Sequence, residues 1–190
     1  MTSPGLVGYV GTVDWRFDPG YVQAAATAMP HITFVIIGRV NAEQEDRVAA
    51  LRQLENVRFL GQLDNREAGK WLGDFMAALI PFTPGAMNDA INPVKMHMYL
   101  AAGLPVVATN IAECVANEHV ITGADPDSFA SALADALAAD NDEAVQQRQR
   151  YGRANTWERR AEEAISLILT QGLLKHDDLT RPLSNTTKTA

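Results

Sequence analysis

The feature that most constrains this chain is the alternation of short runs rich in Val, Ile and Phe with segments of helical length. Such alternation favours a parallel sheet with helices on both faces. We therefore predict an α/β fold: a Rossmann-like, three-layer α/β/α domain with a parallel sheet of about six strands and C-terminal helices. The runs expected to form strands are LVGYVGTV (6–13), ITFVIIGRV (32–40), VRFLGQL (57–63), AALIPF (77–82), PVVAT (105–109) and HVITG (119–123).

Helix starts are chemically marked. An Asp or Asn directly before Pro can cap a helix, because the missing N–H of proline costs nothing in the first turn. An acid three residues after a capping side chain has the spacing of a capping box. These signals occur at Asp18-Pro19, Asn92-Pro93 and Asp125-Pro126, and at Asp64 with Glu67 and Asn155 with Glu158. One domain is expected from residues 1–175, and the polar residues 176–190 are expected to form a disordered tail.

Charge and cysteine content argue against several protein classes. The formal net charge is -7, so a nucleic acid would be repelled, and no basic patch offsets this charge. A single cysteine, Cys114, excludes an intramolecular disulfide and a cysteine-cluster metal site. No apolar run reaches the roughly 18 residues of a membrane span, and no signal peptide is visible. We expect a cytoplasmic protein with no bound metal.

The loop PFTPGAMNDAINPVK (81–95) offers an anion site. In an open parallel sheet, ligands bind beyond the carboxyl ends of the strands, near helix N-termini. With Asn92 as cap and Pro93 as the first helical residue, the amides of Val94 and Lys95 would point into this crevice, where unpaired N–H groups and the helix dipole favour an anion. Lys95 would add a charge. The alternative is that Asn-Pro is only a good helix start.

Two further side chains belong to the same region of the predicted sheet. Arg16 follows the first strand in GTVDWRFDPG, where its forked guanidinium could bind a diphosphate. It could equally pair with Asp14 or Asp18, or stay solvated. Met98 lies one helical turn after Val94, and this spacing indicates a face that contacts the sheet.

Five segments are specific when their order and spacing are taken together: VGYVGTVDWRFD, ITFVIIGRV, NVRFLGQLDNREAGKWLGDFMAALIPF, NPVKMHMYLAAGLPVVAT and NTWERRAEE. They resemble the C-terminal, donor-binding half of retaining GT-B glycosyltransferases, which use nucleotide-sugars. The resemblance runs from about Leu6 to Ala164. It is strongest to the bacterial branch that acts on cell-surface polysaccharides.

The resemblance implies how a nucleotide-sugar would bind. Its diphosphate is expected at Asn92, Val94 and Lys95, with Arg16 supporting the same phosphates. The base is expected at the loop after the third strand. The residues placed there are Leu60, Gly61 and Gln62. The nucleotide-sugar is a substrate, and the resemblance implies no cofactor and no metal, because amides and cations neutralise the diphosphate. No catalytic residue is assigned.

The sequence departs from the family at two glutamates. The glutamate that binds the ribose hydroxyls in the family is replaced by Met98, and the one that contacts the donor sugar is replaced by Ala90. A thioether cannot accept the paired hydrogen bonds that a carboxylate accepts. Asp89, beside the second position, is a candidate sugar contact. A one-residue shift in register, however, turns its side chain to another direction.

Two hypotheses follow from the resemblance, and a third is weaker. The chain is a donor-binding half whose acceptor half lies on an N-terminal domain or a partner chain, or it is a degenerate GT-B-like binding module without catalytic activity. A phospho-receiver is weaker, because Asp14 is the only acid that ends the first strand. The apolar end of the last helix favours a homo-oligomer, and peripheral contact with a membrane stays open.

Overall fold

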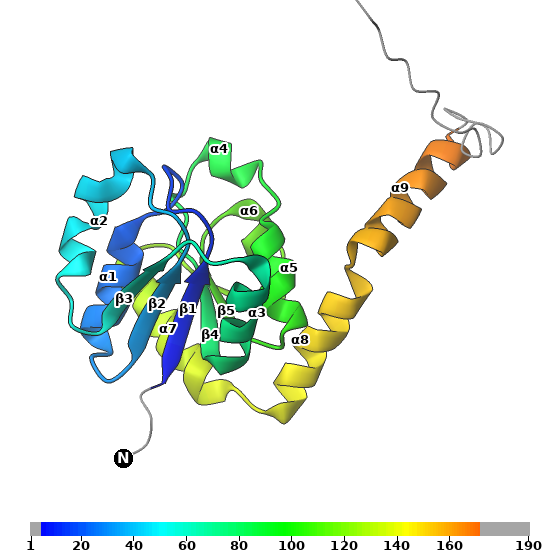
Figure 1. The fold of residues 1–190 in the computed structure, drawn as a ribbon. Helices are drawn as coiled ribbons and strands as arrows, with labels where there is room; N and C mark the ends of the chain where they lie inside the picture. The colour runs from blue at the N-terminus through cyan, green and yellow to red at the C-terminus, as the bar shows by residue number, and fades with distance from the viewer. Residues whose placement is uncertain (1–4, 172–190) are drawn as a thin grey trace, which may run out of the picture. The chain divides into compact units, whose positions relative to one another are not determined.

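Six parallel strands form the centre of the fold in the order β3-β2-β1-β4-β5-β6 (Figure 1). The computed structural model describes residues 5–171 and confirms the predicted Rossmann-like α/β class. The strands are β1 (Leu6–Val10), β2 (Thr33–Ile37), β3 (Val57–Gly61), β4 (Phe75–Ile80), β5 (Val106–Thr109) and β6 (Val120–Gly123). The chain reverses its direction across the sheet between β1 and β4. A ligand crevice is therefore expected beyond the carboxyl ends of these two strands.

Helices cover both faces of the sheet. On one face, α1 (Pro19–Ala28) contacts both α2 (Glu45–Arg52) and α7 (Pro126–Ala139). On the other, α3 (Asn65–Asp74) contacts β1, and α5 (Val94–Ala101) contacts β4 and β5 (Figure 1). The remaining helices are η1 (Ala42–Gln44), α4 (Ala86–Asp89), α6 (Ala112–Val115), α8 (Asp142–Ala154) and α9 (Trp157–Thr170). Residues up to 153 form one compact unit, and α9 belongs to a second one.

α8 is fixed to the end of α5 by backbone contact and a buried charge. A side chain at Gly152 would meet Ala101, so only glycine allows the two helices to approach this closely. The Arg148 guanidinium donates to the carbonyl of Gly103 at 2.8 Å and pairs with Asp140. The Gly103 φ of +87° ends α5 in a conformation that favours glycine.

Three of the five predicted caps are confirmed and two are wrong. The carboxylates of Asp18, Asp64 and Asp125 each accept a hydrogen bond from an amide of the following helix. Asn155 is not the cap of α9, because Thr156 lies one residue nearer the helix and accepts from the Arg159 amide at 3.3 Å. Asn92 does not cap α5 either. The long loop before α5 also contains α4, which the sequence did not predict.

The core consists of the central strands and the helix faces that cover them. β5 is buried along its whole length, as expected for a strand covered on both faces. Cys114 is also fully buried, with its Sγ 3.9 Å from the Met96 Sδ. Burial, together with the Glu113 charge, raises the pKa of this thiol to about 12. No helix within residues 5–171 is both long and apolar enough to span a bilayer.

The predicted tail, residues 176–190, lies outside the described residues.

Candidate functional site

The two loops at the expected ligand crevice, which follow β1 and β4, are joined through their backbones. Phe17, in the loop after β1, forms an antiparallel bridge with Phe82, in the loop after β4. The Asp18 amide donates to the Pro81 carbonyl at 2.8 Å, and the Thr83 amide donates to the Arg16 carbonyl at 2.6 Å. The backbone of Arg16 is therefore fixed at the point where the strand order reverses.

The Arg16 side chain is paired with Asp14, one of the alternatives that the sequence left open. Its Nε lies 3.1 and 3.0 Å from the two Asp14 oxygens, and its amide lies 3.0 Å from Oδ1. Burial alone would raise the pKa of Asp14, but the hydrogen bonds and charge of Arg16, with the charge of Lys95, hold it below its ordinary value. The Arg16 side chain is still 37% exposed.

The Lys95 side chain points beneath the first crevice loop. Its Nζ donates to the Tyr9 hydroxyl at 2.9 Å and lies 4.1 and 4.8 Å from the ring centres of Tyr9 and Phe82. The Tyr9 hydroxyl in turn donates to the Thr12 carbonyl at 2.9 Å. Burial, followed by the Arg16 charge, lowers the pKa of Lys95 to about 7, although Asp14 opposes this shift. Lys95 is therefore unusual among lysines in being able to lose its proton near neutral pH.

Two glycines let the crevice loops approach each other. A Cβ on Gly11 would lie 2.4 Å from the Lys95 Nζ, and a Cβ on Gly38 would lie 2.0 Å from the Gly11 carbonyl oxygen. The Gly38 φ of +144° also disfavours any other residue. Sequence reasoning missed the functions of Gly38 and Tyr9. The signal for Tyr9 was a tyrosine inside a buried strand, which must find a hydrogen-bond partner for its hydroxyl.

α5 begins at the crevice without a side-chain cap. Its first residue is Val94, preceded by Pro93 as the N-cap, so the predicted start at Pro93 is one residue too early. The first hydrogen bond of the helix is donated by the Met96 amide to the Pro93 carbonyl at 2.8 Å. The amides of Val94 and Lys95 precede this bond and have no acceptor within the helix.

Asn92 is held away from these amides by two other side chains. Its amide nitrogen donates to Glu113 at 3.1 Å, and its oxygen lies 3.1 Å from the Nε2 of His97. The prediction that Asn92 caps the helix is therefore wrong. Glu113, on α6, could not have been paired with Asn92 from the sequence, because the contact depends on how β5 and α6 fold back beside α5.

The prediction that Met98 faces the sheet is also wrong. The side chains of Val94 and Met98 are 54% and 38% exposed, whereas Met96, Tyr99 and Leu100 are fully buried. The Tyr99 hydroxyl accepts from the Val10 amide at 2.8 Å, which turns this face of α5 toward the end of β1. The opposite face, with Val94 and Met98, is left open beside the start of the helix.

The predicted sugar contacts lie on and just after α4. Ala90 is exposed, and Asp89 accepts a hydrogen bond from the Ala112 amide at 3.3 Å. The Asp89 carboxylate, at the end of α4, thus lies at the start of α6 and joins the loop between β4 and α5 to that helix. Asn88 is buried beneath, where its amide nitrogen donates to the Thr83 carbonyl at 2.6 Å.

A cavity of about 390 Å³ opens beyond the ends of β1, β2 and β3. Gln62 lines it, but the other two predicted base contacts, Leu60 and Gly61, belong to β3 itself and do not. Gly11 also lines this cavity, and the Lys95 Nζ lies directly beside Gly11. The complete lining is Val10, Gly11, Thr12, Ile37, Gly38, Arg39, Gln62, Leu63, Asn65 and Ala68.

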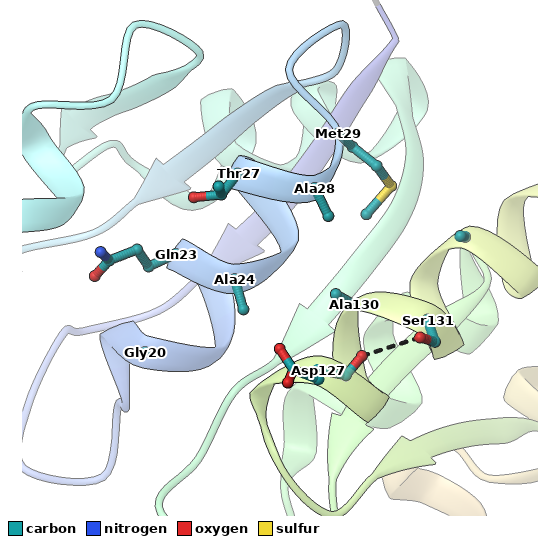
Figure 2. Close-up of a pocket in the computed structure, with 10 residues that line it drawn as sticks. Gly20, Gln23, Ala24, Thr27, Ala28, Met29, Asp127, Ala130 and Ser131 are labelled. Carbon is teal, nitrogen blue, oxygen red and sulfur yellow. Dashed lines mark hydrogen bonds between the residues drawn. The ribbon is translucent and has the colours of Figure 1, made fainter.

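A larger hollow, of about 740 Å³, lies between α1 and α7 (Figure 2). Its walls are mostly small residues such as Ala24 and Ala130, and the Ser131 hydroxyl there donates to the Asp127 carbonyl at 3.0 Å. None of the predicted site residues lines it. Across the described part of the chain, no three His, Cys, Asp or Glu side chains gather as metal ligands.

Comparison with known proteins identifies the family. The family model for glycosyl transferases group 1 matches residues 6–139. The chain belongs to this family. Among curated relatives of this glycosyl transferase domain, TuaH of Bacillus subtilis (strain 168), whose name refers to teichuronic acid biosynthesis, is 25% identical over 158 residues. That match covers 80% of this chain and 40% of TuaH.

Solved structures share the fold of this group 1 glycosyl transferase domain. HepE from Anabaena, crystallised in complex with UDP, has a TM-score of 0.70 and 17% identity, over 87% of this chain and 48% of HepE. A UDP-forming α,α-trehalose-phosphate synthase from Burkholderia vietnamiensis has a TM-score of 0.64 and 16% identity, over 90% and 46% of the two chains. The chain therefore spans about half or less of the length of these relatives.

Proposed function

We propose that this chain is the nucleotide-sugar binding half of a retaining glycosyltransferase, which transfers a sugar to a carbohydrate or lipid-linked acceptor. The observation that carries the proposal is the start of α5, where no side chain caps the amides of Val94 and Lys95 and the Lys95 Nζ lies close to Gly11, in the loop that also holds Arg16. An anion suits unpaired N–H groups at a helix start. Membership of the group 1 family supports sugar transfer, and the UDP complex of the similarly folded HepE supports a uridine donor.

The contribution of these residues to catalysis is electrostatic. When the bond between sugar and diphosphate breaks, negative charge grows on the leaving diphosphate, and fixed amides with nearby cations stabilise it. Arg16 can serve in this way by exchanging Asp14 for a phosphate, because its guanidinium is partly exposed and its backbone is already fixed by the bridge between Phe17 and Phe82. In the retaining mechanism, the acceptor attacks from the face that the diphosphate leaves.

The rest of the enzyme lies outside this chain in our proposal. An N-terminal domain or a partner chain would supply the acceptor site, since this chain spans 40% of TuaH. The donor is bound as a substrate and needs no cofactor or metal, because Arg16, Lys95 and the helix amides offset its charge. We place the protein in the cytoplasm, where nucleotide-sugars are made.

Nucleotide titration tests the proposal. We expect UDP to shift backbone NMR signals of residues around Gly11 and Val94, with GDP and ADP as competitors for the choice of base. Arg16→Ala and Lys95→Ala should each weaken UDP binding at least tenfold, because each removes a charge beside the diphosphate. Arg66→Ala, an exposed change on α3, is the control and should bind normally. The absence of any response to all three nucleotides at millimolar concentrations would contradict the proposal.

A second function, that of an interaction module without donor chemistry, is favoured by the two replaced glutamates. Ala90 and Met98 offer no carboxylate, and the neighbouring Asp89 is hydrogen-bonded to α6. This function predicts no nucleotide affinity, together with a stable homo-oligomer or partner complex. Light scattering on the purified chain, combined with the titration above, separates the two proposals.

A further inference from the structure

One partly buried amine, beside the loop that follows β1, lacks an acidic partner. Within residues 5–171, no ion pair is recorded for Lys95. Its Nζ contacts instead the Tyr9 hydroxyl, the faces of two aromatic rings and the Cα side of Gly11. The carboxylate that influences it, Asp14, has both oxygens engaged by Arg16. A charge in this position is therefore stabilised by ring faces, one hydroxyl and the more distant charge of Asp14, and it has lost much of its hydration.

The other titratable groups that face this amine each keep one state near neutral pH. The hydrogen bonds from Arg16 hold the pKa of Asp14 below its ordinary value, and the same pair raises the pKa of Arg16. Burial raises the pKa of both tyrosine hydroxyls, Tyr9 on β1 and Tyr99 one turn further along α5. Lys95 is therefore the group in this cluster whose charge can change when a ligand arrives.

We propose that Lys95 is a neutral amine in the empty crevice above neutral pH, and that it takes up one proton when the donor diphosphate binds beside Gly11. The inference rests on the proposed function, since the diphosphate supplies the negative charge that the amine lacks. The amine becomes an ammonium ion, and no covalent bond to the donor forms or breaks. The proton comes from solvent, because the Tyr9 hydroxyl already donates its own to the Thr12 carbonyl.

The geometry suits this coupling. Gly11 lines the cavity beyond β1 and has no side chain between the cavity and the amine. A diphosphate there would replace the missing counter-ion, and opposite charges at short range favour the ionised form. Donor affinity should accordingly fall as the pH rises above neutrality, since protonation of the amine then becomes an added cost of binding.

Calorimetry in two buffers measures the proton directly. UDP-glucose is the probe, because its diphosphate diester lacks the phosphate group that titrates near pH 6 in UDP. The 190-residue chain is titrated at pH 8 in HEPES and in Tris, which differ in ionisation enthalpy and add no phosphate that could compete for the site. We expect uptake of nearly one proton per bound ligand at pH 8 and much less at pH 6. Equal binding enthalpies in the two buffers would overturn the inference while leaving the proposed function intact.

Matched variants assign the proton to one side chain. Lys95→Arg keeps a permanent charge and Lys95→Met has none, so both should lose the uptake, whereas Lys70→Met on the exposed surface of α3 should retain it. Uptake that persists in Lys95→Arg overturns the assignment. If UDP-glucose does not bind at all, the proposed function fails together with the inference.

A second measurement does not depend on binding. The NMR signal of the Lys95 Cε, assigned by comparison with Lys95→Arg, should titrate with a midpoint near neutral pH in the free protein. A midpoint close to that of an ordinary lysine, about 10.4, would overturn the inference.

Discussion

Met98 and Lys95 lie close together on one helix, yet they meet different surroundings. Lys95 is drawn toward the end of β1 by the Tyr9 hydroxyl, at 2.9 Å, while Met98 stays on the open face of α5. An exposed thioether beside the proposed diphosphate site cannot accept hydrogen bonds from sugar hydroxyls as a carboxylate can. Because Met98 is exposed, the identity of residue 98 has little effect on packing, and in the proposed function it bears on recognition of the ribose.

Met98→Glu should raise the affinity for UDP about tenfold. A hydrogen bond to a charged group contributes about 1.5–3 kcal/mol, and tenfold in affinity corresponds to about 1.4 kcal/mol. Fluorescence or calorimetric titration measures the change. 2′-Deoxy-UDP should gain less than UDP, and Met76→Glu, an exposed methionine at the start of β4, should gain nothing. An equal gain for both nucleotides would show that the new carboxylate does not reach the ribose.

At the scale of single elements, α5 differs from the helices whose first turns are capped by aspartate. Asp125 accepts from two amides of α7, at 3.0 and 2.9 Å, and Ser128 completes the capping box. Asn92 instead bridges to Glu113 and His97. The start of α5 consequently lacks the stabilising contribution of a side-chain cap.

Asp125→Ala and Asn92→Ala should therefore differ in their effect on stability. Loss of the Asp125 cap should lower the free energy of unfolding measurably, because two amides of α7 lose their acceptor. Asn92→Ala should lower it by less than half as much, because no helix amide loses its acceptor. Urea unfolding monitored by circular dichroism measures both. Equal losses would contradict the view that α5 starts without a side-chain cap.

The sequence predicted the elements well because each carried its own local signal. All six strands and the caps at Asp18, Asp64 and Asp125 follow from residues adjacent in the chain. Asn92 has the same local signal, yet the prediction that it caps a helix is wrong, because its side chain is hydrogen-bonded to Glu113, which is 21 residues away in the sequence. The candidate site residues were chosen by their positions along the chain, but the inward direction of Lys95 depends on Tyr9, which is 86 residues away.

For the whole molecule, Lys95 links stability to pH. In the unfolded chain its pKa returns to about 10.4, whereas burial lowers the pKa to about 7 in the folded protein. Between these values the unfolded state binds one more proton than the folded state. The free energy of unfolding therefore rises with pH through this window, by up to about 1.4 kcal/mol per pH unit from this one group.

Lys95→Met should remove this dependence. The variant should be more stable than the wild type at neutral pH and below, because a thioether suits the space between two aromatic rings better than an ammonium ion does. The advantage should shrink from about pH 7.5 to 9.5, as the wild type gains stability. Urea unfolding across this range measures it. A constant difference between the two proteins would contradict a lowered Lys95 pKa.

The burial of Cys114 offers a natural reporter of how often the domain opens. Its thiol is the only one in the chain, is fully covered and titrates far above neutrality, so a thiol reagent finds no target while the core stays closed. The rate at which the reagent labels Cys114 then reports how often the core opens and exposes this thiol to solvent. A nucleotide that binds only the closed form should lower the rate of Cys114 labelling in proportion to its occupancy, so no further label has to be introduced into the protein.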